Sequence, residues 1–64
     1  MIVEKLRYDD AGKMVKVIYK GSEIKGYLQQ SQNGNFYVSD KTGDTYIQTK
    51  NGRVQGIEEI DLIG

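Results

Sequence analysis

The sequence VKVIYKGSEIKGYL, residues 15–28, determines the predicted fold. β-Branched and aromatic residues dominate it and a Lys-Gly-Ser-Glu turn divides it, so it predicts two antiparallel strands over residues 13–20 and 23–30. In the second strand Ile24 and Leu28 point inward, with Gly26 between them in the same row. A glycine at that position allows a sharp bend or the close approach of another backbone.

The strand over residues 13–20 is the most apolar segment of the chain. Val15, Val17 and Tyr19 share one of its faces, and Met14 and Ile18 share the other. We therefore expect this strand to be at least partly buried on both faces.

Short strands and tight turns are expected on both sides of this central unit. Val and Ile outnumber Leu and Ala, and eight glycines are spread along the chain, so no window is long enough for a helix. A strand is predicted near Ile2 to Tyr8, followed by a turn at residues 9–12 in which Gly12 takes a positive φ. Beyond the unit, residues 31–35 are too polar for a core and predict a loop.

Turn signals continue toward the C-terminus. A short strand with Phe36 and Val38 on one face precedes residues 40–43, which fit a type I turn followed by a glycine bulge. Asn51-Gly52 fits a two-residue type I′ turn, which would place Lys50 opposite Arg53, Thr49 opposite Val54 and Ile47 opposite Gly56.

The segment from Ile57 to Ile63 is predicted to form a single helical turn that leads into a closing strand. Ile60 and Leu62 would then face the interior of the sheet.

Two of these segments resemble a known family. Residues 15–28 look like the strand-turn-strand that opens the Sm core, with Gly21 in the turn and Gly26 before a bent strand, and Asn35-Phe36-Tyr37-Val38 is similar to that family's asparagine-led third strand. The resemblance implies architecture alone. The family has a helix where a first strand is predicted here, and Arg53 and Gly56 lack the spacing of its RNA-contacting Arg-Gly pair.

We therefore expect residues 1–64 to form one all-β domain. Its predicted architecture is a small antiparallel β-barrel or rolled sheet of five to six short strands, SH3-like or Sm-like, with no substantial helix.

Composition removes most chemistry from consideration. The chain has no Cys, His, Trp or Pro, which excludes disulfide scaffolds, zinc fingers, thiol nucleophiles and histidine acid–base catalysis. Three serines have no histidine to activate them, and no Walker-type phosphate loop is present. We expect a protein that is not an enzyme and uses no cofactor.

The sequence also gives no clear signal for a metal site, a membrane span or a secretion signal. The densest acidic segment, residues 40–44, has too few ligands and the wrong spacing for an EF-hand, so it predicts an ordinary turn. No signal peptide or membrane span is apparent, which favours a soluble cytoplasmic protein.

An outward row of three tyrosines is the preferred candidate site. Tyr27, Tyr37 and Tyr46 would lie on neighbouring strands if the predicted meander forms, and exposed tyrosines often mark protein interfaces. The alternative is that these rings only cover a small barrel. The amide-rich segment 29–35 is a second candidate, because its side chains both donate and accept hydrogen bonds; its preferred contacts are Gln30, Gln32 and Asn33.

A lysine–tyrosine surface suggests a different partner. Lys16, Lys20 and Lys25 lie on the central strands together with Tyr19, Tyr27 and Tyr37, and single-stranded nucleic acid is bound by such mixtures of cations and rings. Strand parity opposes the idea, because Tyr19 points away from the face of Lys16 and Lys20. In the alternative, Tyr19 packs in the core and the lysines are ordinary surface charges.

The zero net charge of the chain conceals an asymmetry. Residues 54–64 contain Glu58, Glu59 and Asp61 and no basic residue, whereas the remainder has nine basic and six acidic residues. Such a dipole can orient a partner or a second copy, although it is usually a solvated edge.

These observations favour a non-enzymatic module that binds a protein partner through the tyrosines and the segment 29–35, as an adaptor or inhibitor. Single-stranded nucleic-acid binding through Lys16, Lys20, Lys25 and Tyr27 is the first alternative, and a self-assembling structural component is the second.

Overall fold

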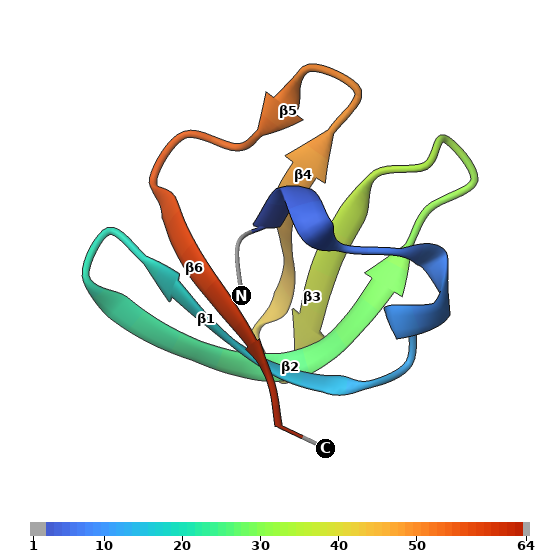
Figure 1. Ribbon diagram of the computed structural model, residues 1–64. Coiled ribbons are helices and arrows are strands. Elements are labelled where there is room, and N and C mark those ends of the chain that lie inside the picture. Colours follow the sequence, from blue (N-terminus) through green and yellow to red (C-terminus); the bar gives the residue numbers. More distant parts are fainter. Residues whose placement is uncertain (1–2, 64) are drawn as a thin grey trace.

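The computed structural model describes residues 3–63, which form a six-stranded antiparallel sheet rolled into a nearly closed barrel (Figure 1). The strand order across the sheet is β5-β4-β3-β2-β1-β6. This architecture confirms the predicted all-β class. The strands are β1 (Met14–Tyr19), β2 (Ser22–Gln30), β3 (Phe36–Asp40), β4 (Gly43–Thr49), β5 (Gly52–Arg53) and β6 (Ile57–Leu62).

Alternation along the strands fills the barrel with aliphatic side chains. Val15 and Val17 of β1 and Leu28 of β2 are completely buried, as the sequence predicts. Each such side chain contributes about 1.5–3 kcal/mol relative to exposure, so these rows are what hold the sheet closed. The rest of the core comes from the other elements: Val3, Phe36, Val38, Ile47, Ile57 and Ile60.

The β1–β2 hairpin is closed by a two-residue turn. Tyr19 pairs with Ser22, so the loop is Lys20-Gly21, and both loop residues have positive φ, 50° and 82°. Positive φ at both positions defines the type I′ turn, whose twist matches that of the flanking strands. This turn lies within residues 15–28, the segment that determines the predicted fold.

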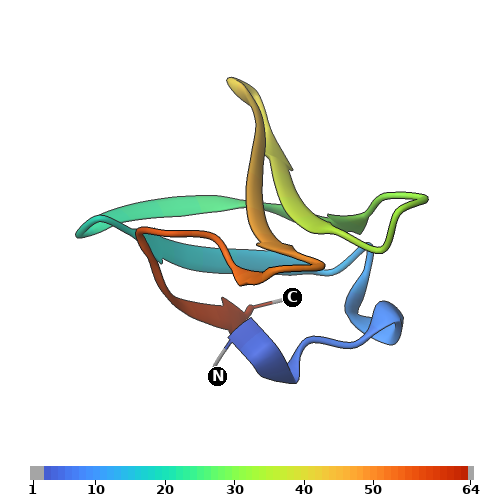
Figure 2. The same ribbon diagram turned by 90° about the horizontal axis from the view of Figure 1, so that it is seen from above.

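Gly26 is the point where β2 bends. A side chain at this position would put its Cβ 2.8 Å from Val38 Cγ1 and closer still to the carbonyl oxygen of Ser39. The backbone of β3 occupies the space that a side chain would need, which confirms the predicted close approach. Beyond this contact β2 continues with β1, while the β3–β4 hairpin rises away from it (Figure 2).

The predicted N-terminal strand is wrong. Ile2 lies outside the described residues, and the chain that follows forms two short 3-10 helices, η1 (Val3–Lys5) and η2 (Tyr8–Asp10). Val3 is completely buried and Leu6 packs against the same core. Val3 and Leu6 are three residues apart, which is the repeat of a 3-10 helix, so both can face the core. A strand would have placed them on opposite faces.

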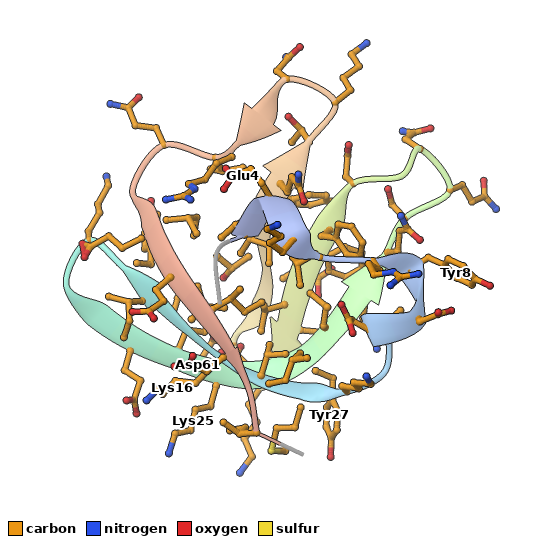
Figure 3. All side chains as sticks on the ribbon, viewed as in Figure 1. Glu4, Tyr8, Lys16, Lys25, Tyr27 and Asp61 are labelled. Carbon is orange, nitrogen blue, oxygen red and sulfur yellow. The ribbon has the colours of Figure 1, made fainter. Side chains whose placement is uncertain are left out.

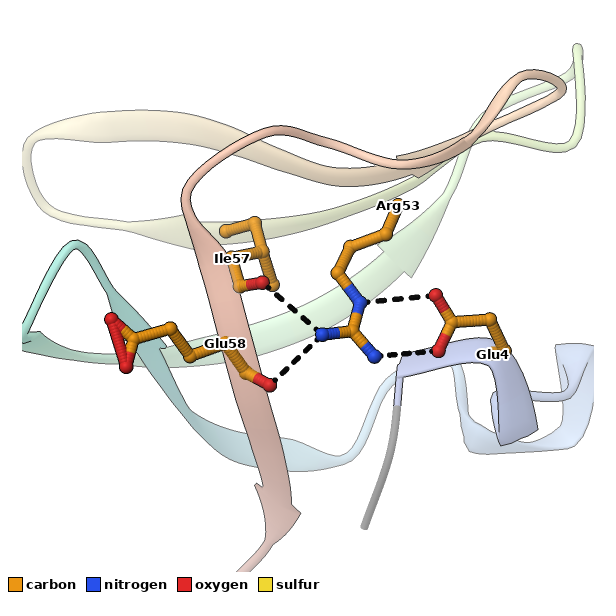
Figure 4. Close-up of polar contacts among 4 residues, drawn as sticks. All are labelled: Glu4, Arg53, Ile57 and Glu58. Carbon is orange, nitrogen blue, oxygen red and sulfur yellow. Dashed lines mark hydrogen bonds and ion pairs between the residues drawn. The ribbon is translucent and has the colours of Figure 1, made fainter.

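The N-terminal segment covers the gap that the rolled sheet leaves. Helix η1 contacts β4, β5 and β6. Glu4 on η1 accepts hydrogen bonds from Arg53 of β5, Nε at 3.0 Å and Nη2 at 2.7 Å, and Arg53 Nη1 donates to the carbonyls of Ile57 and Glu58 (Figure 4). One guanidinium thus joins η1, β5 and the start of β6.

The predicted Asn51-Gly52 turn is also wrong, by two residues of register. Thr49 pairs with Gly52 and Gln48 with Arg53, so the loop is Lys50-Asn51. A type I′ turn would need positive φ at Asn51, but Lys20 is the only non-glycine residue between positions 3 and 63 that has it. The observed register places Val54 against Ile47, the Val54 N–H donating to the Ile47 carbonyl at 3.0 Å, and both side chains join the core.

The C-terminal segment closes the sheet without the predicted helical turn. Strand β6 begins directly at Ile57, which pairs with Tyr19, and a register shift follows where Glu59 pairs with Ile18. Glu58 is the extra residue of this bulge. Ile60 then faces the core, as predicted, and Leu62 packs against it.

Replacing Gly26 with alanine should unfold or strongly destabilise the protein. The new methyl group would meet β3 backbone, which cannot give way as a flexible side chain can, so we expect the upper end of the usual overpacking cost, about 3 kcal/mol. A domain of this size has only about 3–5 kcal/mol in total. Thermal melting by circular dichroism measures the effect, and Lys25→Ala, on the exposed face next to it, is the control; equal melting temperatures would contradict the proposed close contact.

The Glu4–Arg53 contact should make stability depend on acidity. Arg53 holds the pKa of Glu4 below its ordinary value of 4.5, so the folded state is favoured above that pH and loses this contribution as the pH falls through the lowered pKa. Glu4→Gln should therefore lower the melting temperature at pH 7 and flatten its decline below pH 4.5. The matched control is Glu59→Gln on the exposed surface of β6, and identical profiles for the two variants would refute the role of Glu4.

Candidate functional site

Five apolar side chains cross the outer face of the barrel as a continuous stripe. Tyr37 of β3 pairs with Tyr46 of β4, and their ring centroids are 5.2 Å apart. We call this set the outer stripe; it comprises Ile63, Met14, Tyr27, Tyr37 and Tyr46, on or directly after five adjacent strands.

The register connects the stripe from one strand to the next. Tyr27 pairs directly with Met14, and the Ile63 N–H donates to the Met14 carbonyl at 2.9 Å. Tyr27 pairs with Ser39 and is therefore the diagonal neighbour of Tyr37, a separation that aromatic side chains still span. Tyr27, Tyr46 and Ile63 are 51%, 44% and 46% exposed, so solvent reaches the stripe along its whole length.

Charged side chains form a row beside the stripe. Lys25, Lys16 and Asp61 occupy one register line across β2, β1 and β6 and point away from the barrel, next to Tyr27 (Figure 3). Lys16 Nζ lies 3.8 Å from Asp61 and 3.9 Å from Glu23, and Lys25 Nζ lies 3.7 Å from Glu23. Two lysines and two carboxylates compensate one another, so this row has no net charge.

The third lysine of the predicted nucleic-acid surface lies elsewhere. Lys20 is in the turn at the end of the β1–β2 hairpin, and its Nζ is 5.4 Å from the centroid of the Tyr19 ring. Tyr19 itself packs against the core, as strand parity predicts. The structure therefore brings together Lys16, Lys25 and Tyr27 but separates them from Lys20 and Tyr19.

A notch opens next to Tyr27, where β2 and β3 part. It has a volume of about 410 Å³. Its walls are the outer face of β1 and β2 on one side and the start of the β3–β4 hairpin on the other. The lining residues are Met14, Lys25, Gly26, Tyr27, Ser39, Asp40 and Lys41.

The amide-rich segment forms part of a separate, polar cleft. Gln29 and Gln30 belong to β2, so the loop is confined to residues 31–35, where Ser31 N–H donates to the Asn35 carbonyl and Asn35 N–H to Ser31 Oγ. Gln30 Nε2 donates to the Gly34 carbonyl at 3.4 Å, and Gln32 is exposed. The cleft, about 510 Å³, is lined by Asn33, Asn35, Thr49, Lys50 and Asn51, none of which lines the notch.

Two of the three acidic residues near the C-terminus contact other parts of the chain. Glu58 Oε1 accepts the N–H of Gly21 at 3.1 Å, and Asp61 lies beside Lys16. Asp40, in the other acidic segment, accepts hydrogen bonds from the N–H and Oγ1 of Thr42, which hold the pKa of its carboxyl below the ordinary value. This carboxylate stabilises the turn at residues 41–42, which lies where the sequence predicts a turn.

Sequence reasoning missed two members of the stripe. Met14 follows from strand parity, since it lies opposite Val15 and Val17 and pairs with Tyr27. Ile63 follows from the same parity, since Ile60 and Leu62 face inward; its position beside Met14 depends on the register between β1 and β6, which the bulge at Glu58 changes.

Within residues 3–63, no three His, Cys, Asp or Glu side chains come close enough to hold a metal ion. No helix in the described part is long and apolar enough to cross a membrane. What the arrangement offers is an outer stripe of rings and alkyl groups with a groove at its centre, which suits noncovalent binding.

Comparison with known proteins identifies no relative. No protein-family model matches the sequence, and neither the curated proteins nor the solved structures contain a match. Function must therefore be argued from the surface itself.

Proposed function

We propose that this protein is a non-enzymatic binding module whose outer stripe docks on a protein partner. The observation that carries the proposal is the continuity of the stripe across five adjacent strands, with Tyr27, Tyr46 and Ile63 each about half exposed. Tyrosines supply rigid contact area with a polar end, which is why they are enriched where proteins bind one another.

The position of the charges supports a protein partner. Apolar contact at the centre with charged residues at the rim is the usual anatomy of a protein interface. Here the rim is the row of Glu23, Lys25, Lys16 and Asp61, whose charges cancel. A nucleic-acid surface needs uncompensated cations along a phosphate path, and two of the three predicted lysines have carboxylates within 4 Å.

Truncating the stripe should weaken partner binding without unfolding the domain. We expect Tyr27→Ala and Tyr46→Ala each to lose about 1–2 kcal/mol of binding, since exposed aromatic anchors are typical hot spots. The measurement is quantitative capture of partners from a lysate of the source organism with tagged wild-type and variant proteins. Tyr8→Ala is the matched control, because Tyr8 is 74% exposed on η2, is not part of the stripe and lies apart from Tyr27 (Figure 3).

Two results would refute the interface. Capture that is unchanged by both stripe variants would place the contact elsewhere. A collapse of the melting temperature in both variants would mean that the rings support the fold, as cover for the sheet.

Titration with single-stranded DNA and RNA tests the rival function. Because Lys16 and Lys25 are compensated by Glu23 and Asp61, we expect no tight binding even at 50 mM salt. Affinity that falls about 1,000-fold or more between about 50 and 200 mM salt would instead indicate multiple phosphate contacts and favour nucleic acid.

A further inference from the structure

The notch beside Tyr27 is bordered by a strand with one unpaired edge. The pairing of β2 with β3 begins at Gln30 and ends at Tyr27, which faces Ser39. The pairing of β2 with β1 continues for five more residues, to Ser22. Among residues 3–63, residues 22–26 of β2 therefore have a neighbouring strand on only one side.

The hydrogen-bonding direction of these residues follows from a contact at the other end of β2. The Leu28 N–H donates to the Lys13 carbonyl at 2.8 Å, so the backbone groups of Leu28 face the β1 side. In an antiparallel ladder the direction alternates from residue to residue. Glu23 and Lys25 consequently direct their N–H and C=O groups away from β1, toward the side that β3 has left.

The wall formed by the β3–β4 hairpin adds an uncompensated cation. Lys41 is exposed and has no ion-pair partner among residues 3–63, whereas the carboxylate of the adjacent Asp40 is engaged by Thr42. Lys25 on the opposite wall lies 3.7 Å from Glu23, so Lys41 is the cation of the lining that remains available to a ligand. The notch can therefore hold a ligand whose carboxylate pairs with Lys41.

We propose that the notch binds an extended, acidic peptide segment of the partner, which adds to β2 as a strand beside Glu23 and Lys25. This inference rests on the proposed protein-binding function and specifies the form of the partner. Main-chain hydrogen bonds to an open strand edge give affinity, and alternate side chains of the added strand give specificity. Here the side chains on the outer face of the added strand lie over Tyr27 and Met14, and a carboxylate of the segment pairs with Lys41 on the hairpin wall. The volume of about 410 Å³ falls in the range of ligand sites, roughly 300–1,000 Å³.

The test is an NMR titration of the ¹⁵N-labelled protein with a defined probe. The probe is an acetylated and amidated peptide of four valine–glutamate repeats, added up to millimolar concentration, with a valine–lysine peptide and a 16-nucleotide oligo(dT) for comparison. We expect the acidic peptide to shift the amide resonances of Glu23 and Lys25 and to slow the exchange of their protons. The basic peptide and the oligonucleotide should leave both amides unchanged.

Variants separate the backbone contribution from the charge. Lys25→Pro removes the N–H that faces the notch and leaves the ladder to β1 intact, so it should weaken the acidic peptide about tenfold relative to Lys25→Ala, the equivalent of one hydrogen bond. Lys41→Glu should also weaken binding, whereas Lys50→Glu, in the Lys50-Asn51 turn, should not. If Lys25→Pro melts below the working temperature, the test is decided by the Glu23 and Lys25 amide shifts of the wild-type protein and by the affinity of the Lys41→Glu variant for the acidic peptide.

Each contrary result has a definite meaning. No shift at Glu23 and Lys25 with the acidic peptide would overturn strand addition, and equal binding of the basic peptide would overturn the charge assignment. Shifts confined to Tyr37 and Tyr46 would overturn the notch while leaving the outer stripe as the interface. Shifts of Glu23 and Lys25 with oligo(dT) alone would assign the notch to nucleic acid and overturn the proposal.

Discussion

The close approach of β3 to Gly26 is the contact on which the rest of the barrel depends. The sheet rolls up because β2 bends and pairs with different neighbours along its two halves: with β1 from Ser22 to Tyr27 and with β3 from Tyr27 to Gln30. The missing side chain at Gly26 lets the Ser39 carbonyl lie where a Cβ would be. The same bend that closes the sheet separates β2 from the β3–β4 hairpin, so the notch is a geometric consequence of closure.

Closure of the opposite side depends on the N-terminal segment. The chain has no cysteine and hence no disulfide to reinforce it, and a domain of this length has a small core, so each buried side chain counts heavily in the balance against chain entropy. Val3 contributes a fully buried side chain from outside the sheet. The Arg53 guanidinium then donates hydrogen bonds to Glu4 and to two carbonyls at the start of β6. These bonds pair the polar groups between β5 and β6, which are not hydrogen-bonded to each other as strands.

The sequence predicts those elements whose local signals agree with burial, and fails where they disagree. The stretch 15–28 has alternation, a turn glycine and a bend glycine that all favour one hairpin, and the structure has that hairpin. Asn51-Gly52 is an equally strong turn signal, but burying Val54 against Ile47 favours a register that starts the turn one residue earlier. The segment after Ile2 shows a similar conflict. Its alternation suits a strand, but β5 and β6 already form the two edge strands of the sheet. Neither outcome can be read from local preference, since tertiary packing decides both.

The outer stripe and the notch are linked through Tyr27, and this limits how the surface can change. Apolar side chains fill the interior positions, so the proposed binding surface lies on the outside of the barrel. Gly26 cannot vary without disturbing β3, and Met14 lies on a strand whose alternate residues, Val15 and Val17, are core. In the proposed interface, specificity can therefore change at exposed charged positions such as Lys25 and Lys41, where a side chain can be replaced without loss of packing. A scaffold of this kind separates its two requirements by strand parity: one face of each strand maintains the fold, and the other is available for recognition.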